Sequence, residues 1–155
     1  MNLPNRLTVL RVCMVPVFVV FMLWNGLGSS AKYVAAVIFI LASMTDWLDG
    51  YLARKNNLVT DFGKFMDPIA DKLLVCSAMI CLVEKSALPA WILIIIIGRE
   101  FIISGFRLVA SDKGVVIAAS YWGKFKTVSQ MLMVILLILD LGGVFHTIAQ
   151  VLMWI

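Results

Sequence analysis

Charged residues are scarce in this chain. Only 14% of its 155 residues are Asp, Glu, Lys or Arg, whereas 63% are hydrophobic, and the mean hydropathy is +1.02. Ordinary soluble domains carry about a quarter charged residues. The composition therefore excludes a typical soluble domain and indicates an integral membrane protein.

Disulfide and zinc patterns are missing as well. The three cysteines, Cys13, Cys76 and Cys81, lie in apolar runs, and no CxxC spacing occurs. An odd number of cysteines in such runs favours small buried hydrophobic side chains. The single histidine, His146, stands alone near the end of the chain, and we assign it no role.

The first apolar run lacks a signal-peptide cleavage site. It extends from Leu7 to Trp24 and follows positive charge, as the core of a signal peptide does, but no small-residue cleavage motif comes after it. The run therefore predicts a retained first membrane span.

Turn-forming residues divide the apolar sequence into six runs. A membrane-crossing helix needs about 20 mostly apolar residues. The last run begins at Gly143 and is too short to cross, so we expect an incomplete final helix in this chain. The predicted fold is all-α, a single polytopic membrane helix bundle over 1–155. Its full-length spans are 7–25, 32–53, 66–84, 88–110 and 122–140.

Basic residues gather on one side of these spans. Lys32 and Lys85 lie on the opposite side, and Arg99 falls inside the fourth span. The asymmetry places the N-terminus and the connection between the second and third spans on the cytoplasmic side of a bacterial-type inner membrane. It also accounts for the net charge of +4 without nucleic acid as a partner. The cytoplasmic set is Arg6, Arg11, Arg54, Lys55, Lys64, Lys72, Arg107, Lys113, Lys124 and Lys126.

Four aspartates interrupt the apolar pattern where the second and third spans meet that side. Asp46 and Asp49 are three residues apart and Asp67 and Asp71 are four apart, so each pair lies on one helix face. We expect the second pair near a helix N-terminus, where the dipole favours negative charge. Converging carboxylates repel unless a cation joins them. All-oxygen ligands suit Mg²⁺, Mn²⁺ or Ca²⁺ rather than zinc; the alternative is a solvated charged loop.

Small residues follow the first aspartate pair. Gly50 and Ala53 continue the second helix, and glycine in a helix interior costs about 1 kcal/mol relative to alanine. Close approach of a bulky ligand explains both residues, and so does close packing of a neighbouring helix. The sequence leaves these two readings open.

The string DWLDGYLAR, eight further residues and GKFMDPIAD resemble the signature of the CDP-alcohol phosphatidyltransferases, D-x-x-D-G-x-x-A-R-x(8)-G-x-x-x-D-x-x-x-D. The resemblance covers nearly the whole chain, departing where the family's sixth helix continues. It implies a six-helix membrane fold, two Mg²⁺ or Mn²⁺ ions, a homodimer, and phosphatidyl transfer from CDP-diacylglycerol to an alcohol with release of CMP. Every specified position matches: Asp46, Asp49, Gly50, Ala53, Arg54, Gly63, Asp67 and Asp71.

Roles for these residues follow from the resemblance. It implies that all four aspartates are metal ligands and that Asp71 is also the general base. Arg54 alternatively anchors the chain at the membrane interface, and Asn5 or Thr8 alternatively caps the first helix. The implied CDP-diacylglycerol site comprises Asn5, Thr8, Asp46, Asp49, Gly50, Ala53, Arg54 and Gly63.

A second candidate site is basic. Arg99 and Arg107 are eight residues apart, two helical turns along one face. An arginine deep in a span indicates function, although an ion pair with Glu100 is an alternative. NLPNRLTVLR and GREFIISGFRLVASDKGVVIAAS resemble family members whose acceptor is glycerol 3-phosphate. The implied acceptor set is Arg99, Arg107, Lys124, Lys126 and Lys72; attraction to anionic headgroups is the alternative for Lys124 and Lys126.

Other acceptors and another class of protein compete with this interpretation. Inositol phosphate, serine or phosphatidylglycerol could replace glycerol 3-phosphate, but the basic set favours a phosphorylated acceptor over serine. A divalent-cation transporter would carry acidic residues near the bilayer midplane on several helices. Here the four aspartates crowd one boundary instead.

Overall fold

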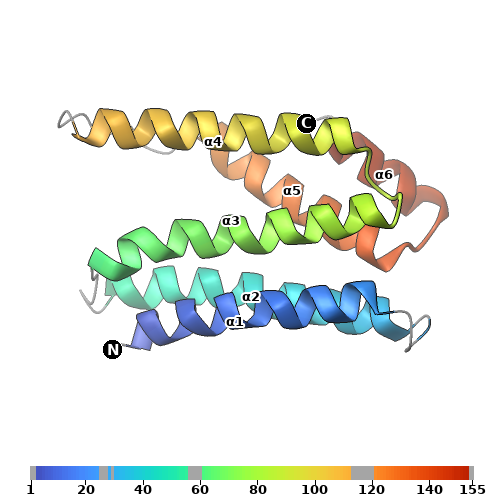
Figure 1. The fold of residues 1–155 in the computed structure, drawn as a ribbon, viewed down its shortest axis with the longest axis horizontal. Coiled ribbons are helices and arrows are strands. Elements are labelled where there is room, and N and C mark those ends of the chain that lie inside the picture. Colours follow the sequence, from blue (N-terminus) through green and yellow to red (C-terminus); the bar gives the residue numbers. More distant parts are fainter. Residues whose placement is uncertain (1–2, 25–27, 29, 56–60, 113–120, 154–155) are drawn as a thin grey trace. The chain divides into compact units, whose positions relative to one another are not determined.

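The computed structural model describes residues 3–24, 28, 30–55, 61–112 and 121–153. Within its helices, side chains are described except at 3–7, 46–55, 61–65, 67, 68, 108, 111, 112, 122 and 124. The described backbone is all-α, which confirms that part of the predicted fold (Figure 1). The chain divides into two compact units, 1–81 and 82–155. Whether they form a single domain stays a prediction.

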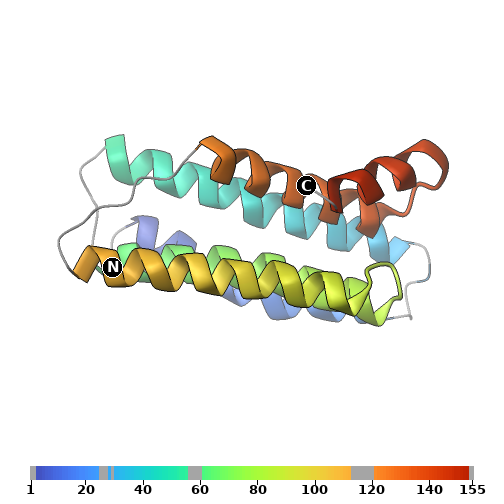
Figure 2. The same cartoon turned by 90° about the horizontal axis from the view of Figure 1, so that it is seen from above.

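The first unit contains α1 (Leu3–Leu23), α2 (Ser30–Lys55) and α3 (Asp61–Glu84) as far as Cys81. Helices α1 and α2 run antiparallel and pack against each other, with α3 alongside them (Figures 1 and 2). The buried residues of α1 repeat at intervals of three and four: Thr8, Arg11, Val15, Phe18 and Met22. This spacing forms one continuous stripe on a helix.

Small residues allow α2 to approach α1 closely. Ala35 and Ala42 are fully buried on either side of Phe39. The Phe39 ring meets the ring of Phe18 with their centroids 5.9 Å apart and tilted by 49°, a separation typical of favourable aromatic pairs. This contact fixes the register of the two helices.

The structure excludes one alternative about α1 and contradicts one expectation about α3. Because α1 begins at Leu3, Asn5 and Thr8 lie inside the helix, and neither is its N-cap. Helix α3 begins at Asp61, so Asp67 and Asp71 lie beyond its first turn. The dipole effect falls off within that turn. The negative charge of this pair is therefore not offset by a helix N-terminus.

The second unit continues from the end of α3 through α4 (Ala90–Asp112), α5 (Tyr121–Leu139) and α6 (Gly143–Met153). The turn after α3 is closed by two backbone bonds, from Ala87 N–H to the Leu82 carbonyl and from Ser86 N–H to the Val83 carbonyl. Ser86 takes the left-handed conformation, with φ of 58°. These are the bonds of a Schellman motif. Helix α5 packs against α6.

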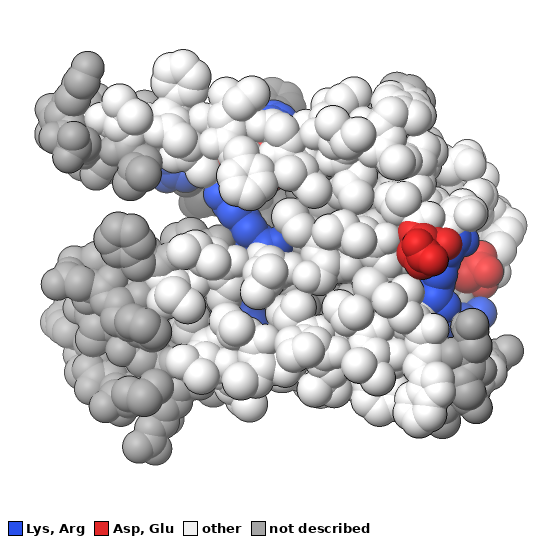
Figure 3. All heavy atoms as spheres, in the orientation of Figure 1, with Lys and Arg blue, Asp and Glu red and all other residues white. Residues whose placement is uncertain are grey.

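Apolar side chains dominate the described surface. On the described part of the face shown in Figure 3, uncharged residues (white) predominate, and Lys, Arg, Asp and Glu occupy only a few places. Large apolar side chains on α4 are strongly exposed, including Ile94 at 70%, Phe101 at 68% and Phe106 at 71%. Among the residues that the structure describes, no helix meets the length and hydropathy required to cross a membrane.

Candidate functional site

Two polar side chains complete the buried stripe of α1. Thr8 and Arg11 are both fully buried, at 0% exposure, although the rest of the stripe is apolar. An arginine is almost never fully buried unless it is paired. Burial of this kind costs several kcal/mol unless other groups compensate the charge. The N-terminal half of α1 therefore buries a charged side chain.

The register of α1 and α2 places these residues level with the first aspartate pair. Arg11 lies seven residues before Phe18, and Asp46 lies seven residues after Phe39, so their backbone positions are at the same height in the antiparallel pair. By the same count Thr8 is level with Asp49. Asp46 and Asp49 also continue the spacing of Ala35, Phe39 and Ala42 on α2.

The second aspartate pair continues a buried stripe of α3. Asp67 and Asp71 lie seven residues before Leu74 and Ala78, which are both fully buried. Seven residues are about two helical turns, so each aspartate position shares a face with its buried counterpart. Asp71 is half-buried, as is the neighbouring Lys72.

Most of the signature lies outside the described side chains. Among residues whose side chains are described, no three His, Cys, Asp or Glu come together as a metal site. Asp71 is the one aspartate of the signature in that set, so the four-carboxylate site stays a prediction. The predicted site residues outside it are Asn5, Asp46, Asp49, Gly50, Ala53, Arg54, Gly63, Asp67 and Lys124.

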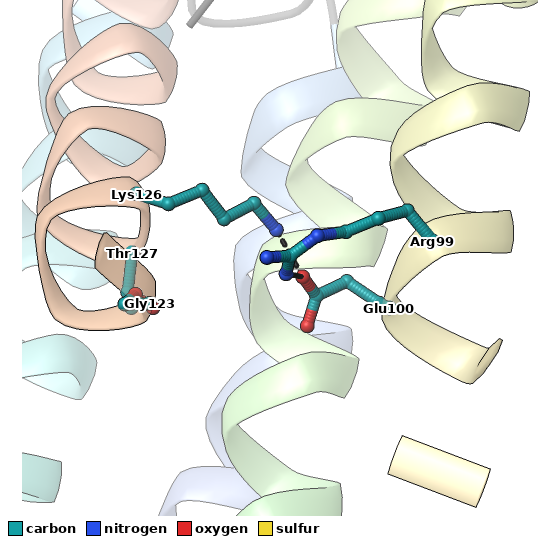
Figure 4. A network of polar contacts seen from close by, with 5 residues as sticks. All are labelled: Arg99, Glu100, Gly123, Lys126 and Thr127. Carbon is teal, nitrogen blue, oxygen red and sulfur yellow. Dashed lines mark hydrogen bonds and ion pairs between the residues drawn. The ribbon is translucent and has the colours of Figure 1, made fainter. Parts of the chain in front are cut away.

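The basic site is described in more detail, and its centre is a carboxylate (Figure 4). Oε1 of Glu100 on α4 accepts a hydrogen bond of 2.7 Å from Nη1 of Arg99. The same oxygen accepts one from Nζ of Lys126, which reaches across from α5. The side chains of Arg99, Glu100 and Lys126 are 44%, 25% and 19% exposed. The anticipated ion pair with Glu100 is thus present, and Lys126 joins it.

A cavity of about 480 Å³ lies beside this network, within the second unit. Arg99, Lys126, Ser129 and Gln130 supply its polar groups. Sequence reasoning missed Ser129 and Gln130, although their positions three and four residues after Lys126 place them on the same helix face. The apolar lining consists of Trp91, Ile92, Ile95, Ile96, Phe125, Met133, Leu152 and Met153.

Arg107 and Thr127 lie near these residues in the sequence but do not line the cavity. Arg107 lies on α4 two turns beyond Arg99 and is exposed. It is not among the described residues that line the cavity. Thr127, next to Lys126, donates its hydroxyl to the Gly123 carbonyl at 3.0 Å and so bonds to its own helix (Figure 4). Among the predicted basic residues whose side chains are described, Arg99 and Lys126 are therefore the two that line the cavity.

Comparison with known proteins gives the same assignment as the signature. The profile of the CDP-alcohol phosphatidyltransferase family matches residues 1–155. The chain belongs to this family. Membership in the CDP-alcohol phosphatidyltransferases means that the relatives of this chain are membrane-embedded enzymes that use divalent metal ions.

Individual family members are similar along most of their length. A CDP-diacylglycerol–glycerol-3-phosphate 3-phosphatidyltransferase from Bacillus subtilis is 50% identical over 148 residues, covering 89% of this chain and 77% of its own length. A protein of the same name from Rickettsia typhi is 40% identical, with coverages of 99% and 88%. A probable phosphatidylglycerophosphate synthase from Mycobacterium tuberculosis is 44% identical, with coverages of 98% and 73%.

Proposed function

We propose that this chain transfers the phosphatidyl group of CDP-diacylglycerol to glycerol 3-phosphate, which yields phosphatidylglycerophosphate and CMP. The observation that carries this function is the complete signature at 46–71 in a chain 40–50% identical to relatives named for the same reaction. The basic cavity of the second unit suits an acceptor that carries its own phosphate. The product enters phospholipid biosynthesis.

The donor chemistry of the signature fits a divalent metal. The four aspartates offer only hard oxygen ligands, and their backbone positions continue stripes that are buried elsewhere on α2 and α3. We assign Asp46, Asp49, Asp67 and Asp71 as the residues that would hold two Mg²⁺ or Mn²⁺ ions. When bound, these ions supply positive charge that stabilises the negative charge gathering on the departing CMP.

The chain's own residues bind the substrates and move the proton. The Asp71 carboxylate takes the proton from a hydroxyl of glycerol 3-phosphate as that oxygen attacks the β-phosphorus of CDP-diacylglycerol. A new P–O bond forms, the pyrophosphate P–O bond breaks, and CMP leaves. Asn5, Thr8, Gly50, Ala53, Arg54 and Gly63 bind the donor with the aspartates, and Arg99, Arg107, Lys124, Lys126 and Lys72 hold the acceptor phosphate.

The proposal also includes a location. The chain would be a multi-pass protein of a bacterial-type inner membrane with its aspartates at the cytoplasmic face and, by family resemblance, a homodimer. The distribution of Lys and Arg supports this orientation. The exposed side chains of Ile94, Phe101 and Phe106 suit contact with lipid.

A direct assay tests the function. Purified protein is incubated with CDP-diacylglycerol, Mg²⁺ or Mn²⁺ and one acceptor at a time, and CMP release is measured. We expect release with glycerol 3-phosphate and none with serine. Faster release with inositol phosphate or phosphatidylglycerol would contradict the proposed acceptor. No CMP release with any alcohol would contradict the reaction itself.

A further inference from the structure

Glu100 occupies an unusual position for a carboxylate beside an anion site. Among the described residues that line the cavity, every charged side chain is cationic, namely Arg99 and Lys126. Glu100 contacts both cations yet is itself absent from that lining. A carboxylate inside the cavity would repel a phosphate, whereas one placed outside the lining leaves the cations between itself and the ligand.

The two cations retain donors for a second partner. A guanidinium has five N–H groups, and the bond to Glu100 uses Nη1 of Arg99. An ammonium has three N–H groups, and Lys126 directs one of them to the same Oε1 atom. Each cation can therefore bind Glu100 and a phosphate oxygen at once. Ser129 and Gln130 add neutral polar groups to the lining of the cavity.

Lys126 gains the most from this arrangement. Its four-carbon stem carries about 2 kcal/mol of rotamer entropy, and it comes from a different helix than Arg99. The shared carboxylate oxygen holds the two head groups near one point (Figure 4). A phosphate that arrives afterwards meets two cations that are already oriented, so less ordering is required on binding.

We propose that Glu100 is a positioning residue for acceptor binding: it orients Arg99 and Lys126 toward the phosphate of glycerol 3-phosphate without contacting that substrate. This inference rests on the proposed function, because it assigns the cavity to the acceptor. The inference explains why a carboxylate, Glu100, lies beside a site that binds an anion. The same contacts would serve as a plain brace between α4 and α5 if no phosphate bound there, and kinetics separates the two roles.

The test is the Glu100→Gln variant, which removes the charge and keeps the side-chain shape. CMP release is followed with each substrate varied in turn while the other is saturating. We expect the KM for glycerol 3-phosphate to rise about tenfold, the loss expected when one charge-assisted hydrogen bond is weakened. The KM for CDP-diacylglycerol stays unchanged, and kcat changes less than about threefold because ground-state and transition-state binding are lost together.

Further variants sharpen the result. Glu84→Gln, at the exposed end of α3, is the matched control and should leave both KM values unchanged. Glu100→Asp keeps the charge and should raise the KM for glycerol 3-phosphate less than Glu100→Gln does. In a Lys126→Met background, Glu100→Gln should have a smaller effect than in the unmodified chain, because residues that act through one another are not additive.

Several outcomes would overturn the inference. An unchanged or lowered KM for glycerol 3-phosphate in Glu100→Gln would show that the carboxylate does not orient the cations. An equal rise in both KM values, together with a lowered thermal midpoint, would indicate only a brace between helices. If Glu100→Gln does not fold, an unchanged KM for glycerol 3-phosphate in Lys126→Met would overturn it, because the carboxylate would then orient a cation that the substrate does not use. Failure of the unmodified chain to use glycerol 3-phosphate is a separate result, which contradicts the proposed function itself.

Discussion

The two units hold their polar residues in opposite ways. In the first unit, Thr8 and Arg11 are fully buried within a helix stripe, so helix packing fixes their positions before any ligand arrives. In the second unit, Arg99, Glu100 and Lys126 are partly exposed and hold one another through hydrogen bonds beside a cavity. Packing gives rigid placement at a high cost of desolvation. Mutual pairing orients Arg99 and Lys126 while leaving both side chains able to bind an arriving anion. The contrast suits the metal site proposed for the first unit and the exchangeable acceptor proposed for the second.

The largest expected effect concerns the metal ions proposed for the first unit. Excess EDTA should abolish CMP release, and Mg²⁺ or Mn²⁺, but not Zn²⁺, should restore it, because hard cations match carboxylate ligands. The measurement is CMP release before and after metal addition to one chelated, desalted sample. Undiminished CMP release in EDTA would show that the reaction does not need a divalent metal ion.

Substitution of Asp71 distinguishes an effect on catalysis from an effect on substrate binding. Asp71→Asn should lower kcat about 10³-fold, within the range expected for loss of a general base, and leave the affinity for CDP-diacylglycerol largely intact. CMP release and a binding titration are compared for the same preparation. Asp140→Asn, an exposed site just after α5, is the matched control. Equal losses of binding and turnover would show that Asp71 acts chiefly as a ligand.

A matched pair of arginine substitutions tests the contrast in burial. Arg11→Met should destabilise the protein by about 2–3 kcal/mol, because the fully buried guanidinium is part of the packed stripe of α1. Arg99→Met should cost no more than about 1 kcal/mol, because that side chain is 44% exposed. Urea or thermal unfolding of the two variants in the same detergent gives the comparison. Similar losses of stability would mean that burial does not distinguish the two sites.

The smallest expected effect involves a glycine of α4. A Cβ added at Gly105 would meet no atom within 4 Å. Gly105→Ala should therefore raise the stability of α4 by at most about 1 kcal/mol through helix propensity, and leave both KM values unchanged. Thermal unfolding and the CMP assay are the measurements. A clear loss of stability would indicate that another surface approaches this position closely.

Much of the fold could be predicted from the sequence because turn chemistry divides the apolar runs. Helix ends were less accurate. A membrane-span criterion counts apolar residues, but backbone hydrogen bonds extend a helix past the apolar stretch, so α3 begins at Asp61 rather than near residue 66. The conformation of the turn after α3 was also difficult to predict, because Ser86 occupies a left-handed position that more often belongs to glycine.

The sites differ in how far the sequence could define them. The aspartates stand at fixed spacing on two helices, so a pattern is enough to propose them as one group. The link between Glu100 and Lys126 joins residues 26 positions apart, and it depends on how α4 and α5 face each other. No local pattern contains that information. Ser129 and Gln130 lay within reach of sequence reasoning, since they follow Lys126 at helical intervals.

The aromatic contact between Phe18 and Phe39 has a consequence for changes in chain length. Because it sets the heights of Arg11 and Thr8 along α2, one residue inserted between Arg11 and Phe18 would rotate both polar side chains by about 100° around the axis of α1. They would then leave the stripe that Phe18 continues, while the aromatic pair itself stayed in place. We therefore expect this part of α1 to tolerate exchanges of outward-facing residues far better than any insertion or deletion.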